Sequence, residues 1–289
     1  MIALIKRNLL LYFRDKGSVA VSLISVFVVI GIYFLFLGEA AANGLYAIET
    51  FESRARARLI VGGLFMGGAI AVAALTTSLQ ALGRMVEDRQ QVLKDITISP
   101  VSQTKITLSY IISSAVVGMI MSFIVFIFAY VYLTIRGLPF IGFGGIGLIF
   151  LTTFLTVLCA CSMMYFIVMF IKSRGAFTAV NSIFGVGGGF LMGAFIMIGM
   201  MPTAVQWLIK LFPLSHSVSM FRIILAQSEI EYGLANDPYW VERYQYDTGI
   251  MFDFAGFTST FWFSAGILVA TTVLFFGLSL LAHRFRKSK

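Results

Sequence analysis

Residues 84–105 read RMVEDRQQVLKDITISPVSQTK, a short and densely charged stretch between two long apolar runs. The run before it, 59–82, and the run after it, 106–135, contain no Asp, Glu, Lys, Arg or His. A helix crosses the hydrocarbon core of a bilayer with roughly 20 apolar residues. The stretch is therefore interpreted as a charged connection between two membrane-spanning helices, and this interpretation decides the fold class.

The composition of the whole chain agrees with a membrane protein. Of its 289 residues 59% are hydrophobic and 12% are charged, whereas a soluble domain carries about 25% charged residues. The two cysteines, Cys159 and Cys161, lie together in an apolar run, which excludes a disulfide framework and a four-ligand zinc site. We expect no metal site, no catalytic site and no nucleic-acid partner.

Six apolar runs are long enough to cross a membrane. We predict an all-α membrane protein with six transmembrane helices, preceded by an amphipathic interfacial helix over residues 1–18. The predicted spans are 19–38, 59–82, 106–135, 144–171, 175–200 and 256–282. The pieces that lie inside when both termini are inside hold most of the 21 Lys and Arg residues. By the positive-inside rule, both termini are expected in the cytoplasm.

The predicted spans contain no Asp, Glu, Lys, Arg or His, which bears on the energy source of the protein. Proton-coupled transporters and voltage sensors need such groups inside the membrane, although sodium can be held by carbonyls and hydroxyls alone. The chain also lacks a G-x-x-x-x-G-K-[ST] phosphate loop of its own. These absences favour a transporter powered by another chain, and they leave open a self-contained channel or facilitator, or a membrane enzyme or scaffold.

Several motifs together point to a known family. RN at 7–8 and RDKG at 14–17 lie in the lead helix, and EDR at 87–89 and SPVS at 99–102 lie in the charged stretch. Before the last span stands MPTAVQWLIKLFPLSHSVSMFRIIL, 201–225. With these motifs the chain resembles the membrane subunits of ATP-binding-cassette (ABC) exporters, specifically the type 2 permease family. The resemblance covers nearly the whole chain.

The resemblance implies a fold and partners. It implies a re-entrant helical hairpin over 201–228, an extracellular loop over 229–255, and two separate ATPase subunits that bind ATP and magnesium. A second membrane subunit, identical or homologous, would complete the transporter in the lipid bilayer of a prokaryotic cell membrane. The expected function is export of a hydrophobic or amphipathic substrate such as a drug, antibiotic, lipid or peptide, as in multidrug efflux. Export of polysaccharide or ions is the alternative.

The charged stretch is expected to be the coupling helix that docks into the ATPase. Pro100 disfavours helix at Ser99, so a helix from residue 84 would end near 98. A plain solvated loop is the alternative. The residues expected to contact the ATPase are Arg84, Glu87, Asp88, Arg89, Leu93, Lys94 and Asp95.

Two further groups of residues lie inside the predicted spans. By the resemblance, spans one, two and five line the interface between the membrane subunits, and their polar or aromatic residues could line a substrate path or simply pack. These are Asn181, Phe184, Thr76, Thr77, Gln80, Phe27 and Phe34. Small residues spaced by four allow close helix packing, and for the three glycines at 185–193 a hinge or a substrate passage is the alternative. These are Gly185, Gly189, Gly193, Gly63 and Gly67.

Overall fold

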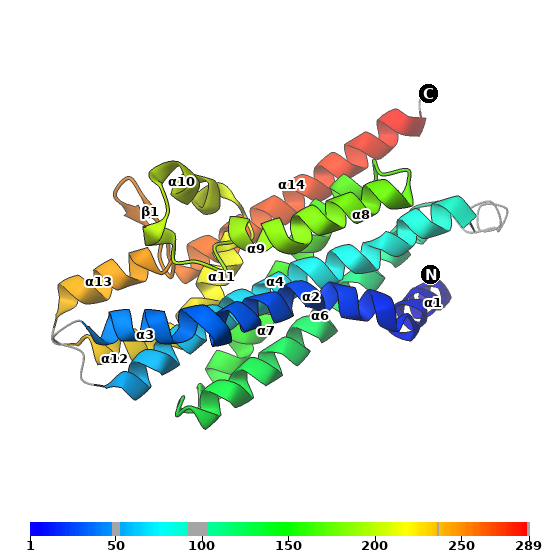
Figure 1. Ribbon diagram of the computed structural model, residues 1–289. Helices are drawn as coiled ribbons and strands as arrows, with labels where there is room; N and C mark the ends of the chain where they lie inside the picture. Colours follow the sequence, from blue (N-terminus) through cyan, green and yellow to red (C-terminus); the bar gives the residue numbers. More distant parts are fainter. Residues whose placement is uncertain (48–52, 92–102, 236, 288–289) are drawn as a thin grey trace.

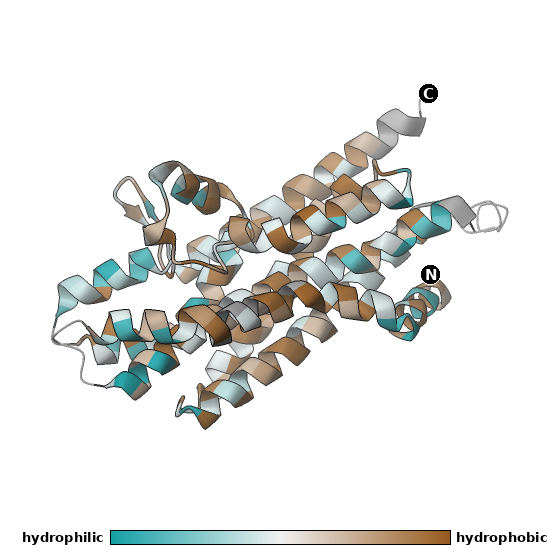
Figure 2. Ribbon diagram, in the orientation of Figure 1, coloured by the Kyte–Doolittle hydropathy of each residue, from teal (hydrophilic) through white to brown (hydrophobic). Residues whose placement is uncertain are grey.

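The computed structural model describes the chain except for residues 48–52, 92–102, 236 and 288–289. The described chain is an elongated bundle of helices (Figure 1). Hydrophilic residues gather at its two ends and hydrophobic residues fill the middle, as Figure 2 shows. We call the two ends the α1 end and the α13 end.

The elements follow one another as a series of helices with one small hairpin. The long helices are α2 (Lys16–Ile32), α4 (Arg54–Gln91), α6 (Gln103–Ile135), α7 (Gly142–Val168) and α14 (Phe261–Lys287). The shorter helices are α1 (Ile2–Arg14), α3 (Gly38–Tyr46), α8 (Arg174–Ser182), α9 (Gly188–Leu191), α10 (Thr203–Leu211), α11 (Ser215–Arg222), α12 (Ser228–Gly233) and α13 (Pro238–Asp247). The π-helical turns are η1 (Tyr33–Leu37), η2 (Ile183–Gly187) and η4 (Ile223–Gln227), and η3 (Ile198–Met200) is a 3₁₀ turn. Two-residue strands β1 (Asp253–Phe254) and β2 (Phe257–Thr258) pair antiparallel.

The central element is α4, which has 38 residues. Its most apolar 18-residue window is completely buried inside the chain. Gly62, Gly63, Gly67 and Gly68 and a run rich in Ala at 69–74 give this helix a narrow surface, so its neighbours approach closely. Helices α2, α3, α6, α7 and α11 all pack on it. The second predicted span therefore forms the core of the bundle.

The pair Gly63 and Gly67 lies where α4 meets α11 and η4. A Cβ atom on Gly63 would lie 2.8 Å from the carbonyl oxygen of Leu225, and one on Gly67 would lie 3.2 Å from the backbone nitrogen of Arg222. A backbone atom cannot move aside as a flexible side chain can. Both positions therefore depend on the missing side chain.

We predict that Gly63→Ala lowers stability by about 1–3 kcal/mol, because the added methyl group overpacks this contact. The matched control is Gly31→Ala in α2, where an added Cβ meets no atom within 4 Å and Ala is the better helix former. Thermal unfolding of the two purified variants in detergent measures the difference. Equal unfolding temperatures would contradict the packing role of Gly63.

The six predicted spans are confirmed only in part. Among the described residues, the helices long and apolar enough to cross a membrane lie in α4, α6, α7 and α14. The pair formed by Thr203–Leu211 and Ser215–Gly233, bent by 89°, would count as a fifth span if it crosses. The first and fifth predicted spans are interrupted by η1 and η2, and neither is a single α-helix. An all-α membrane protein is thus confirmed, whereas six spans are not.

The fifth predicted span, 175–200, ends earlier than expected. Its helical run stops at Leu191, and Gly193 follows with a positive φ of 66°. The backbone N–H of Ala194 donates to Gly189 and that of Gly193 donates to Phe190, which is a Schellman motif. The prediction that Gly185, Gly189 and Gly193 form one helical ridge is therefore wrong, because Gly193 terminates the helix.

The region before the last helix contains more structure than predicted. The break between α10 and α11 falls at Pro213, as expected. The re-entrant path expected over 201–228 is not settled by the bend alone. The predicted outer loop, 229–255, holds most of α12, all of α13 and strand β1. Asp237 caps α13 by accepting a hydrogen bond from the backbone of Trp240, and Pro238 occupies the first helical turn.

Candidate functional site

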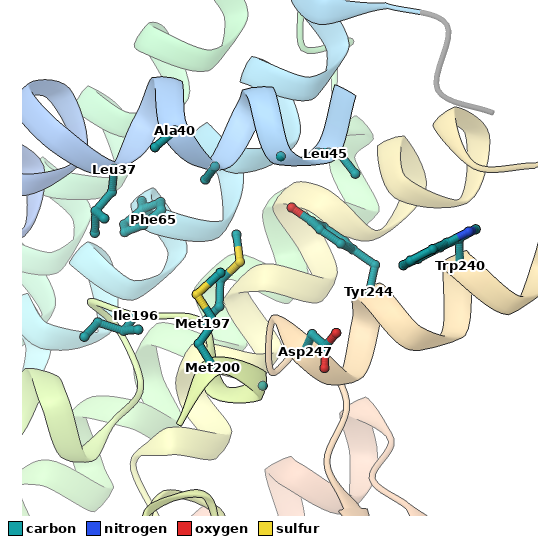
Figure 3. A pocket seen from close by; sticks show the side chains of 13 residues that line it. Leu37, Ala40, Leu45, Phe65, Ile196, Met197, Met200, Trp240, Tyr244 and Asp247 are labelled. Carbon is teal, nitrogen blue, oxygen red and sulfur yellow. The ribbon is translucent and has the colours of Figure 1, made fainter. Parts of the chain in front are cut away.

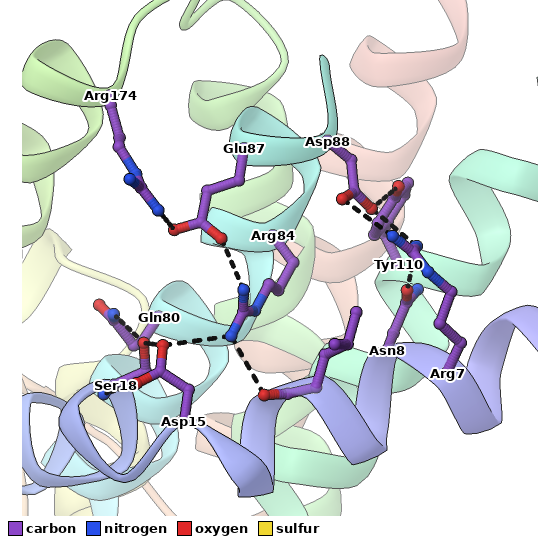
Figure 4. A network of polar contacts seen from close by, with 11 residues as sticks. Arg7, Asn8, Asp15, Ser18, Gln80, Arg84, Glu87, Asp88, Tyr110 and Arg174 are labelled. Carbon is purple, nitrogen blue, oxygen red and sulfur yellow. Dashed lines mark hydrogen bonds and ion pairs between the residues drawn. The ribbon is translucent and has the colours of Figure 1, made fainter. Parts of the chain in front are cut away.

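The first part of the charged stretch, 84–91, is the end of α4 rather than the start of a helix of its own. Residues 84–91 continue α4 without a break, so the separate coupling helix predicted to begin at residue 84 is not observed. Leu93, Lys94 and Asp95 lie outside the described residues. The end of α4 carries Arg84, Glu87 and Asp88 into a network of polar contacts at the α1 end (Figure 4). Arg89, in the same turn, makes separate contacts.

Asp88 joins three helices in this network. Its side chain is buried, and its two carboxylate oxygens accept hydrogen bonds from the guanidinium of Arg7 at 2.8 and 3.0 Å. The hydroxyl of Tyr110 donates to the same carboxylate at 2.5 Å. Charge-assisted bonds of this kind are stronger than neutral ones. The hydrogen bonds that Arg7 donates to Asp88 also raise the pKa of Arg7. Asp88 therefore holds α1 and α6 against α4.

A second group of contacts joins α4 to the end of α1 and the start of α8. Arg84 donates to Glu87 at 2.8 Å, to Asp15 at 3.1 Å and to the carbonyl oxygen of Leu11 at 3.1 Å. On its other side Glu87 accepts a hydrogen bond from Arg174 at 2.6 Å. The pKa of Asp15 is lowered by hydrogen bonds from Ser18 and by the charge of Arg84. Glu87 is thus shared between two cations.

Arg89 lies against the end of α7. Its guanidinium donates to the backbone carbonyls of Met169 and Ile171, each at 3.2 Å, and to that of Val168 at 3.4 Å. The carbonyls at a helix C-terminus carry partial negative charge, so a cation is stabilised there. Arg89 therefore fixes α7 to α4.

Together these contacts change the interpretation of the charged stretch. The charges were expected to face outward to a partner, but the four described ones bind the protein's own helices. Sequence reasoning did not identify their partners Arg7, Asp15, Tyr110 and Arg174 as site residues. The sequence places both acidic and basic residues at the predicted inner ends of several spans. It does not indicate which of them pair.

At the opposite end, Arg222 occupies the centre of a second network. The residue is only 3% exposed, and none of the ion pairs among the described residues includes it. Its guanidinium donates to the carbonyl oxygens of Leu64 at 3.1 Å, Thr248 at 2.7 Å and Gly193 at 2.8 Å. Thr248 and Gly193 follow the ends of α13 and α9, where free carbonyls need partners. Arg222 therefore joins four segments without any acid.

His216 fixes the start of α11 to α14. Its Nδ1 lies 3.1 Å from the hydroxyl of Ser264, and its Nε2 lies 3.2 Å from the carbonyl oxygen of Lys210. The ring stacks on Phe254, with centroids 6.2 Å apart and planes 8° from parallel. Both ring nitrogens of His216 thus have a hydrogen-bond partner within the protein.

The predicted substrate-path residues fall into two groups. Thr76 and Thr77 are buried. The hydroxyl of Thr76 donates to the carbonyl oxygen of Ser22 at 2.8 Å and so joins α4 to α2, whereas that of Thr77 donates to Ala73 at 2.6 Å within α4. Gln80 is part-buried, and its amide nitrogen lies 3.5 Å from the hydroxyl of Ser18.

The second group lies closer to the surface. Phe27 is 63% exposed, and Asn181 and Phe184 are half-buried. The side chain of Phe34 lies outside the described residues. Of the helix-packing glycines, Gly185 is half-buried, and Gly189 is buried directly against the ring of Phe195. The structure does not bring all the predicted path residues onto one surface.

Comparison with known proteins supplies the family. The sequence model described as ABC-2 family transporter protein matches residues 55–281, from the start of α4 almost to the end of α14. No curated protein and no solved structure gives a match. The match covers far more than half of the chain and includes both networks apart from α1. An ABC-2 membrane component implies partnership with an ATPase subunit and with the lipid bilayer. The chain therefore belongs to the ABC-2 transporter family, as a multi-pass permease membrane subunit.

Proposed function

We propose that this chain is the membrane-spanning subunit of an ATP-driven exporter for a hydrophobic or amphipathic substrate. Two ATPase subunits would bind ATP and magnesium on the α1 end, which we place in the cytoplasm. The observation that carries the proposal is the network around the end of α4, in a chain of the ABC-2 family. A force on this end reaches five helices at once, because α1, α6, α7 and α8 are all bonded to α4.

The proposed docking segment is the sequence that follows this network. Leu93, Lys94 and Asp95 follow α4 closely in the sequence and are the remaining predicted coupling residues. We expect them to contact the ATPase. Arg84, Glu87, Asp88 and Arg89 would instead transmit the displacement into the bundle. ATP must favour one of two arrangements over the other, because a ligand that binds both equally moves nothing.

An exposed apolar face suits a second membrane subunit. Helix α2 contacts η1 and η2, and α9 contacts η2; the outward side chains of these four elements are large and hydrophobic. They are Val21, Ile24, Phe27, Leu35, Phe36, Ile183, Val186 and Phe190, each at least 44% exposed. We propose that an identical or homologous subunit packs here and that substrate passes between the two. Phe27, Phe184 and Asn181 border this face and remain the proposed substrate contacts.

The experiment that tests the function is co-purification followed by transport. The tagged chain, extracted in mild detergent, should retain an ATPase, and the reconstituted complex should move a neutral lipophilic dye such as Nile red only when ATP is hydrolysed. Uphill transport by the chain alone, with no ATPase present, would overturn the proposal. Dye flux that only follows its gradient would establish the facilitator class instead.

A charge reversal tests the docking segment. We predict that the double variant Lys94→Glu with Asp95→Lys releases the ATPase or reduces ATP-dependent transport at least about tenfold, since like charges across an interface cost several kcal/mol. The matched control is Glu242→Lys, an exposed charge on α13 at the opposite end. Pull-down and transport measure both. A double variant that retains its ATPase and full transport would refute docking at this segment.

A further inference from the structure

A cavity of about 450 Å³ opens at the α13 end, far from the network around α4 (Figure 3). Its walls come from η1 and α3 on one side, Phe65 of α4 at the base, the turn at 196–200, and α13 opposite. This volume lies within the 300–1,000 Å³ usual for small-molecule sites. Met197 and Met200 supply flexible side chains that adapt to different shapes.

One polar group in this wall has no partner. Tyr244 is only 9% exposed, and its hydroxyl is buried without a hydrogen-bond partner among the described residues. Figure 3 shows the ring lying in the wall with the hydroxyl directed towards α3. A buried hydroxyl left unpaired costs about 1–3 kcal/mol. A ligand that supplies the missing partner would recover this energy on binding.

The charge at the cavity restricts the ligand further. The acid in the wall is Asp247, and its carboxylate already accepts a hydrogen bond from Arg243 at 3.0 Å. The pairing with Arg243 already offsets the charge of Asp247, so a cationic ligand gains little there, and an anionic ligand would face the carboxylate. Aromatic and thioether groups form much of the remaining wall. A neutral apolar molecule with one hydrogen-bonding group therefore fits best.

We propose that this cavity binds a neutral, mainly apolar small molecule through one hydrogen bond to Tyr244. Resting on the exporter function proposed above, the site is an outer station that holds cargo after it has passed the bundle. Phe65 and Arg222 connect it with the rest of the protein, because Phe65 belongs to α4 and Arg222 bonds Gly193 before the turn at 196–200 and Thr248 at the end of α13. The site thus defines a substrate class, neutral amphipaths.

Binding is measured on the full chain in phosphatidylcholine nanodiscs, without ATPase or ATP. The probe is radiolabelled N-phenyl-1-naphthylamine, a neutral molecule with one N–H group, and empty nanodiscs give the background. We expect saturable binding by the wild-type chain. Tyr244→Phe should raise Kd about fivefold, the effect of one hydrogen bond. Met197→Trp, which fills the cavity, should remove saturable binding. Tyr239→Phe, an exposed tyrosine on the same helix, should leave Kd unchanged.

A stability measurement separates a binding role of the hydroxyl from a structural one. Ligand-free Tyr244→Phe should unfold at the same temperature as the wild type or higher, because it removes an unpaired buried group. A lower unfolding temperature, an unchanged Kd in this variant, or no saturable binding at all would overturn the proposal. The binding assay contains no ATPase, so its result is independent of the co-purification test. If binding is observed while co-purification fails, the site stands and only the exporter function is refuted.

Discussion

The Arg222→Met variant is expected to lose at least about 3 kcal/mol of stability and to loosen the whole α13 end. Each hydrogen bond to a charged group contributes about 1.5–3 kcal/mol, and Met keeps the length of the side chain but removes all three bonds. The carbonyls of Thr248 and Gly193 would then be buried at helix ends without their cation. Thermal unfolding in detergent measures the loss, and hydrogen exchange locates it in α13 and in the turn at 192–200.

Two matched variants make this prediction specific. Arg222→Lys retains the charge but cannot reach three carbonyls in different directions, so an intermediate loss is expected. Lys210→Met removes an exposed cation of the same end that bonds the carbonyl of Asp253, and its effect should stay within about 0.5 kcal/mol. If Arg222→Met unfolded like Lys210→Met, Arg222 would not be the centre of this end.

The Asp88→Asn variant is expected to lose about 2–3 kcal/mol and to free α1 from the bundle. Removing one partner of a buried ion pair costs about 3–5 kcal/mol, and the partial exposure of Arg7 reduces this value. Asn keeps the shape and can still bond the hydroxyl of Tyr110, so the variant isolates the charge. Faster hydrogen exchange in α1 and a lower unfolding temperature are the measurements.

A double-mutant cycle with Arg7→Gln tests the pairing directly. If Arg7 acts through Asp88, the double variant should be little worse than either single variant, with a coupling energy of at least about 1 kcal/mol. The surface pair of Glu39 and Arg58 serves as the control, since Glu39→Gln should cost no more than about 1 kcal/mol. Additive effects of Arg7→Gln and Asp88→Asn would show that the two side chains act independently.

The sequence alone predicted the class of fold because that prediction rests on local composition. Long apolar runs without charges, the helical spacing of the first residues and the break at Pro213 are all properties of neighbouring residues. The family resemblance, carried by short motifs at both ends of the chain, is confirmed by the match over residues 55–281. These signals do not require knowledge of which helices touch.

The pairing of the charges could not be predicted for the same reason. Arg7 and Asp88 are 81 positions apart, and Arg174 and Glu87 are 87 positions apart, so no local pattern distinguishes an outward charge from one bonded inside. The role of Arg222 could not be predicted either, because its partners are backbone carbonyls, which every residue possesses. The end of the fifth helical run was different. Gly193 after Leu191 is a recognisable stop signal, and it was overridden by the spacing of the glycines.

Because α4 is one unbroken helix, it can transmit a movement from one end of the bundle to the other. With 38 residues and about 1.5 Å per residue, this helix measures roughly 57 Å from Arg54 to Gln91. A tilt of about 5° around its midpoint therefore swings each tip by about 2.5 Å in opposite directions. A displacement of this size is comparable with the length of the hydrogen bonds that hold each tip. A small tilt of α4 driven at one tip is therefore enough to exchange the contacts at the other.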